Sequence, residues 1–157
     1  MIPKKAQEYI DKLGLLPHPE GGFYKETYRS AVKTGDRNLM TAIYFLITSN
    51  NISRFHRIKS DEMWYFHDGS PLSVHTLDKE NGHQVHKVGL NLSNGENPQL
   101  LVPANTIFGS SLDEENAFSL VSCTVAPGFD FADFELFTTQ DLLSQFPDYE
   151  EIVRKMS

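Results

Sequence analysis

The chain has 157 residues, of which 22% are charged and 11% aromatic, and its formal net charge is −7. This composition is typical of one globular domain, so we expect a single domain over residues 1–157, and it excludes a disordered or fibrous chain. The basic residues are scattered rather than gathered in a patch, so we expect no nucleic-acid partner.

The first predicted element is a short amphipathic helix over residues 3–13. Ala6, Tyr9, Ile10 and Leu13 recur at helical spacing, and Gly14 stands where a C-terminal cap would lie. The loop that follows, residues 17–22, is stiffened by prolines and loosened by two glycines. It has two interpretations: a lid that presents functional groups to a ligand, or a tight connection into the next strand.

Residues 23–29 alternate like a β-strand, which predicts Tyr24, Glu26 and Tyr28 on one face and Arg29 on the other. A buried carboxyl group needs polar partners. Glu26 is therefore a candidate pocket residue if this face points inward and an ordinary surface residue if it points outward.

Short apolar runs separated by turn signals continue along most of the chain. Each run has strand length, and together they predict an all-β sandwich or barrel over residues 39–47, 52–58, 62–67, 72–77, 83–88, 99–102, 106–111 and 117–125. Residues 139–143 and 147–156 predict two short helices at the C-terminal end.

Cys123 is the one cysteine, and it lies in the apolar run 118–126. We interpret it as a small core residue rather than a reactive thiol, because no basic or histidine neighbour lies close in sequence. The chain has no apolar run of secretory length, and its longest apolar stretch is too short to cross a bilayer. We therefore expect a cytoplasmic protein with no membrane partner.

The most informative segment is residues 55–69, which we interpret as a hairpin. It places His56 on the first strand and Glu62 at the start of the second, so the two side chains are predicted to meet on one barrel face. Such a pair can be structural, can ligate a metal, or can share a proton. Trp64 has the same alternation parity as Glu62, and it either lines a cavity or belongs to the core.

The same segment resembles the first cupin motif, which runs Gly-x5-His-x-His-x3–4-Glu-x6-Gly. His56, Glu62 and Gly69 match, whereas Asn50 and Ile58 replace the first glycine and the second histidine. In the second cupin motif, Pro103 fits and Asn105 stands for the glycine, but the histidine position is Phe108 and the closing asparagine is Leu112. Two of the four usual metal ligands of the superfamily are thus apolar here.

Three longer blocks resemble the small single-domain cupin family catalogued as a domain of unknown function. They are residues 17–30, residues 55–57 with 61–64, and residues 125–136. The resemblance implies an all-β cupin double-stranded β-helix, a jelly-roll-like barrel, with a short N-terminal helix and short C-terminal helices. It also implies a homodimer, which we expect to form near the exposed strand 23–29.

We therefore predict that a small molecule binds in the barrel, without a cofactor. One form of this hypothesis is acid–base chemistry that resembles the sugar-nucleotide epimerases of the superfamily, with His56 as base, Glu62 fixing its tautomer, and Tyr24 or Tyr28 as acid. The alternative is a metal-dependent cupin oxygenase or isomerase with the reduced ligand set His56 and Glu62. The candidate ligand-binding residues are His18, Glu20, Tyr24, Glu26, Tyr28, Trp64 and Phe108.

Overall fold

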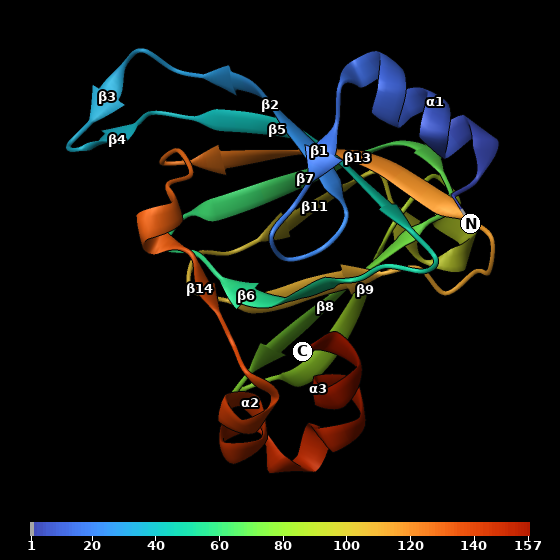
Figure 1. The fold of residues 1–157 in the computed structure, drawn as a ribbon. Helices are drawn as coiled ribbons and strands as arrows, with labels where there is room; N and C mark the ends of the chain where they lie inside the picture. Colours follow the sequence, from blue (N-terminus) through green and yellow to red (C-terminus); the bar gives the residue numbers. More distant parts are fainter. Residues whose placement is uncertain (1) are drawn as a thin grey trace.

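The computed structural model describes residues 2–157, and it is built mainly from two facing β-sheets (Figure 1). The all-β prediction is confirmed. The N-terminal helix α1 covers Lys4–Leu13 and ends at Gly14, which adopts the left-handed conformation and donates its N–H to the Ile10 carbonyl.

The first sheet has six strands in the order β1-β2-β5-β13-β7-β11. Every pair in it is antiparallel. The strands are β1 (Leu16–Pro17), β2 (Phe23–Arg29), β5 (Thr41–Thr48), β7 (Asp61–Gly69), β11 (Gln99–Val102) and β13 (Phe118–Ala126).

The second sheet also has six strands, in the order β10-β9-β8-β12-β6-β14, and only the β10–β9 pair is parallel. The strands are β6 (Ser53–Arg57), β8 (Leu72–Asp78), β9 (Gly82–Val88), β10 (Glu96–Asn97), β12 (Ile107–Ser111) and β14 (Glu135–Leu136). A small hairpin of β3 (Lys33–Thr34) and β4 (Arg37–Asn38) projects beyond the first sheet (Figure 1).

The remaining elements are short helices. The 3₁₀ turns are η1 (Leu92–Asn94), η2 (Phe131–Asp133) and η3 (Pro147–Tyr149), and the two C-terminal helices are α2 (Thr139–Gln145) and α3 (Glu150–Met156). Thr138 begins α2 with a capping box, in which its hydroxyl accepts from the Asp141 N–H and the Asp141 side chain accepts in return. No helix among residues 2–157 is long and apolar enough to span a membrane.

The main core lies between the two sheets, and it includes Phe45, Trp64, Val74, Phe108 and Val121. A second cluster fills the space between the outer face of the second sheet and the helices α2 and α3 (Figure 1). Strand β8 is therefore buried on both faces along almost its whole length. This explains why its sequence carries apolar residues without a clean alternation.

A β-bulge in β2 changes which side chains face the barrel. Glu26 pairs with Ile43 and Tyr28 pairs with Ala42, so β2 has one extra residue opposite β5. The extra residue reverses the alternation after it. Tyr28 is consequently 50% exposed, and the prediction that it shares a face with Tyr24 and Glu26 is wrong.

Candidate functional site

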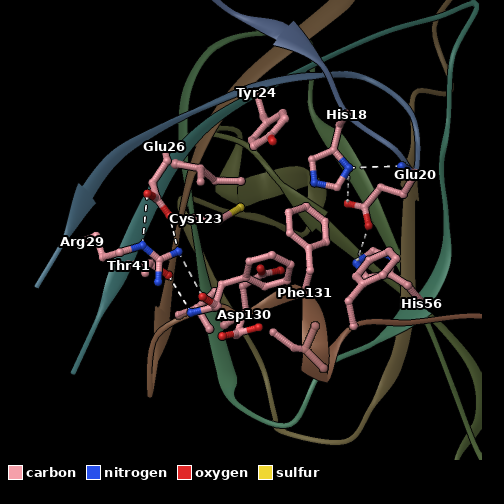
Figure 2. Close-up of a pocket in the computed structure, with 16 residues that line it drawn as sticks. His18, Glu20, Tyr24, Glu26, Arg29, Thr41, His56, Cys123, Asp130 and Phe131 are labelled. Atoms are coloured by element: carbon pink, nitrogen blue, oxygen red, sulfur yellow. Dashed lines mark hydrogen bonds and ion pairs between the residues drawn. The ribbon is translucent and has the colours of Figure 1, made fainter. Parts of the chain in front are cut away.

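A pocket of about 460 Å³ opens between the two sheets, and sixteen residues line it (Figure 2). Figure 2 shows His18, Glu20 and His56 at one end and Glu26 and Arg29 at the other, with the ring of Phe131 between them. The pocket therefore has two polar ends joined by an apolar middle.

The loop between β1 and β2 brings His18 and Glu20 into the pocket. Gly21 has φ +117°, and a Cβ at this position would lie 1.8 Å from the Ile52 carbonyl oxygen, so only glycine lets the loop pack this closely. Arg54 holds the loop from the other side: its backbone N–H donates to the Glu20 carbonyl at 3.0 Å, and its guanidinium donates to the Pro19 carbonyl at 2.8 Å. The loop is thus fixed against β6, next to His56.

His56 and Glu20 form the closest contact between an imidazole and a carboxyl group in the pocket. His56 Nδ1 lies 2.6 Å from the Arg54 carbonyl oxygen, which can only accept, so Nδ1 carries the hydrogen. His56 Nε2 then lies 3.1 Å from Glu20 Oε2, a buried atom with no hydrogen-bond partner in the free pocket. A hydrogen bond across this contact requires one proton, held either by the carboxyl group or by the imidazole.

Burial favours the neutral form of this pair. It lowers the pKa of His56 to about 3. Burial, reinforced by the Glu62 carboxyl, raises the pKa of Glu20 well above its ordinary value. The proton accordingly resides on Glu20 when the pocket is free, and both members of the His56–Glu20 pair are neutral.

Whereas His56 donates a hydrogen bond from Nδ1, His18 accepts one at that nitrogen. Its Nδ1 accepts from the backbone N–H of Glu20 at 3.2 Å, and its ring lies edge-on to Tyr24 with a centroid separation of 4.5 Å. Burial lowers the pKa of His18 to about 4, so the imidazole is neutral and carries its hydrogen on Nε2. That nitrogen faces away from Glu20 into the pocket (Figure 2).

Glu62 lines the pocket from the first sheet, but it does not pair with His56 as predicted. The segment 55–69 is not a hairpin: β6 belongs to the second sheet and β7 to the first, and the chain crosses between them near Ser60. The partner of His56 is therefore Glu20, and the Arg54 carbonyl fixes its tautomer in place of Glu62. Burial raises the pKa of Glu62 to about 8, although the nearby indole of Trp64 opposes the rise.

The other end of the pocket carries Arg29, which the sequence places on the opposite face of β2. The bulge returns it to the face of Glu26, and its guanidinium contacts the two Glu26 oxygens at 2.6 and 3.2 Å. It also donates to Asn38 Oδ1 at 2.9 Å and to the Phe129 carbonyl at 3.1 Å. A bulge leaves no clear signal in a single sequence, so alternation alone could not have identified Arg29.

Three aromatic rings form the wall near the mouth of the pocket. Phe129, Phe131 and Phe134 pack edge to face, with centroid separations of 4.9 to 6.3 Å. Their loop is held by Asp133, which accepts two hydrogen bonds from Arg37 at 2.9 and 2.8 Å. No pattern in the sequence identified these rings as part of the pocket wall.

Trp64 and Phe108 lie in the core and do not line the pocket. Phe108 packs against His56 with ring centroids 4.2 Å apart, so it supports the pocket from below. Cys123 is buried, as predicted, but it also lines the pocket. Burial raises the pKa of its thiol, which keeps the sulfur protonated and unreactive.

The residues present do not fit the metal centre that the cupin motifs would build. Ile58 and Phe108 supply no ligand atom, and His56 directs Nε2 at Glu20. Residues 2–157 contain no group of three or more His, Cys, Asp or Glu side chains arranged to hold a metal ion. The metal-dependent alternative stays a prediction that elemental analysis of purified protein would test.

Comparisons with known proteins agree with the fold described above. A family model described as Cupin superfamily (DUF985) matches residues 7–137. The uncharacterized protein YML079W of Saccharomyces cerevisiae is 31% identical over 171 residues, which cover 90% of this chain and 79% of the relative.

Comparison with solved structures also supports this fold. A hypothetical protein from Leishmania major is 40% identical with a TM-score of 0.92, over 97% of this chain and 98% of that one. Protein SO0799 from Shewanella oneidensis is 44% identical with a TM-score of 0.92, over 97% and 96%. An oxalate decarboxylase from Bacillus subtilis has a TM-score of 0.58 at 12% identity, over 89% of this chain and 36% of that one, and this likeness shows the fold alone.

Proposed function

Because this chain belongs to the cupin family described as Cupin superfamily (DUF985), we propose that it binds a small polar molecule in its barrel pocket and moves a proton to or from it. The observation that carries this proposal is the 3.1 Å contact between His56 Nε2 and Glu20 Oε2 inside a pocket of about 460 Å³. Pockets of this size suit small metabolites, and a buried acid–base pair that faces one needs a reason to be there.

The pair has what general acid–base catalysis requires. The Arg54 carbonyl holds the imidazole in one tautomer, so its other nitrogen is always ready to exchange the Glu20 proton. The apolar part of the wall lowers the local polarity, which strengthens hydrogen bonds that a ligand makes there. In this proposal Glu20 exchanges its proton with the bound molecule, and the neutral His56 positions the Glu20 carboxyl group.

Binding can be tested without knowing the ligand. Purified protein is equilibrated across a dialysis membrane with a metabolite extract, and the retained compounds are identified by mass spectrometry. We expect wild-type protein to retain at least one small polar compound and the variant His56→Ala to lose it. His75→Ala is the matched control, because His75 is another buried histidine that does not line the pocket.

Proton transfer has its own readout. Incubation of a retained compound with the protein in D₂O should place solvent deuterium at one carbon position, and Glu20→Gln should abolish this exchange. The glutamine amide can still donate to His56 Nε2, so thermal unfolding of this variant should stay close to wild type. Retention of the same compounds by His56→Ala, with the fold intact, would contradict the binding proposal.

A further inference from the structure

Acidic side chains outnumber basic ones on the pocket wall. Four carboxyl side chains line it, those of Glu20, Glu26, Glu62 and Asp130, against the single guanidinium of Arg29. Glu26 already occupies that guanidinium through two contacts. Arg54 acts on Glu20, whereas Glu62 forms no ion pair with any cation among the described residues.

Glu62 differs from the other three carboxyl side chains because it has no ion-pair partner within the part of the chain that the structure describes. Its residue is only 9% exposed, and among residues 2–157 it forms no ion pair, whereas Trp64 Nε1 lies near it without reaching hydrogen-bond geometry. Glu96 shows how the fold treats another buried glutamate. It is 7% exposed, but it accepts from the Asn91 N–H at 3.2 Å and from the Asn94 amide at 3.4 Å. A buried carboxyl group without such partners is costly, so its position on the pocket wall indicates that a ligand supplies the partner.

The rest of the wall limits what that partner can be. The rings of Phe129, Phe131 and Phe134 stand beside the mouth, and aromatic faces attract organic cations. A hydrated metal ion would gain little from these rings, and an anion would meet the excess of carboxyl groups. An ammonium group on an apolar or aromatic body would suit both the unpaired Glu62 carboxyl group and the aromatic rings.

We infer that the pocket takes a small organic cation, with its ammonium group on the Glu62 carboxylate and its apolar body against Phe129, Phe131 and Phe134. This inference rests on the proposed function, because it names the class of ligand for the same pocket. When the ammonium ion arrives, the Glu62 carboxyl group releases its proton to solvent, and the ligand keeps all of its own. The site at Glu62 is thereby neutral both before and after binding, as burial favours.

The test uses three probes of one shape and different charge: benzylamine, benzyl alcohol and benzoate. Each is titrated into ¹⁵N-labelled protein at neutral pH, and the dissociation constant is taken from the amide shifts of residues that line the pocket. We expect benzylamine to bind about tenfold or more tightly than benzyl alcohol, since a charge-assisted hydrogen bond is involved, and benzoate to bind most weakly. Glu62→Gln should remove the preference for the amine, whereas Glu96→Gln should keep it.

Three results would overturn the inference: equal binding of the alcohol or benzoate, an amine preference that survives in Glu62→Gln, or no shift in the pocket with any probe. Thermal unfolding of both variants shows whether they are folded. The proposed function is judged separately, because its dialysis experiment does not depend on ligand charge. A pocket that retains a neutral metabolite would keep that proposal and reject this one.

Discussion

The Arg54 carbonyl decides which nitrogen of His56 carries the hydrogen, and this can be measured directly. Because Nδ1 donates to that oxygen, we expect the Nδ1–H tautomer. Burial lowers the pKa of His56 to about 3, so the imidazole should remain neutral between pH 5 and 8. Two-bond ¹H–¹⁵N correlation spectra of the ring would show this. An Nε2–H tautomer, or titration near the ordinary value of 6.5, would contradict the geometry of the pair.

Glu62 gives the protein a characteristic pH dependence. The folded state holds this proton up to a pKa of about 8, whereas the unfolded chain releases it near 4.5. The stabilising effect is complete below the unfolded pKa and is lost as the pH rises toward 8. The lowered pKa values of His18 and His56 act in the opposite sense, but only below 6.5, where the unfolded chain takes up protons.

Between pH 6.5 and 8 the raised carboxyl groups, Glu62 and Glu20, therefore dominate. We expect the free energy of unfolding to fall as the pH rises, by at most about 1.4 kcal/mol per pH unit for each proton that the folded state retains. Urea unfolding at several pH values in this window measures the slope. Glu62→Gln should make the slope shallower, and an unchanged slope in this variant would count against a protonated Glu62.

At the scale of elements, the loop over residues 17–22 determines whether the site exists. Gly21→Ala would push a methyl group into the Ile52 carbonyl at a φ of +117°, so we expect a loss of roughly 2–4 kcal/mol in stability and displacement of Glu20 from His56. Gly35→Ala is the matched control. Gly35 also has positive φ, at +64°, but nothing lies within 4 Å of the added Cβ, so about 1 kcal/mol is expected. Equal thermal stability of the two variants would show that the loop is not packed as described.

The mouth of the pocket depends on the projecting hairpin. Arg37 in β4 holds the loop of Phe129 to Phe134 through its two hydrogen bonds to Asp133. Arg37→Ala should increase amide hydrogen exchange in residues 129–134. Arg154→Ala, which removes an exposed pair with Glu150 on α3, should leave that exchange unchanged. Unchanged protection of the loop in the Arg37 variant would mean that other contacts hold it.

The sequence patterns predicted most elements but not how two of them are used. Turn signals and apolar runs located nearly every long strand, because the start and end of a strand depend mainly on residues that are adjacent in the sequence. The crossing at Ser60 depends on which sheet each strand joins, so proximity in sequence made β6 and β7 look like a hairpin. The bulge in β2 likewise depends on pairing with β5, and it removed Tyr28 from the predicted site and added Arg29.

At the scale of the molecule, the cupin fold could be predicted because three blocks spread over residues 17–136 resemble one family. The same blocks contain His18, Glu20 and His56, and all three line the pocket. Their partnership could not be predicted, since the Glu20 loop and β6 are joined only through contacts such as Arg54 with Pro19. The roles of these residues in a reaction stay a prediction.

The oligomeric state of the protein is also a prediction. Strand β1 pairs only with the first two residues of β2, which leaves the edge of residues 25–29 open beside the exposed Tyr28 and Val32. We propose that two copies associate along this edge, since natural proteins rarely leave such an edge uncovered. Light scattering should give twice the 17.8 kDa of the chain, and Tyr28→Glu should weaken the dimer. Leu90→Glu, at an exposed position elsewhere, is the control. A monomer mass for wild-type protein at micromolar concentration would reject the proposal.

A crystal structure of the protein with a metabolite that it retains in dialysis would show directly whether the pocket binds ligand. We expect the compound to lie in the pocket between the two sheets, with a polar group at hydrogen-bond distance from Glu62 or from the His56–Glu20 pair. A compound bound elsewhere on the molecule, with only ordered water between His18, Glu20, His56 and Glu62, would contradict this expectation.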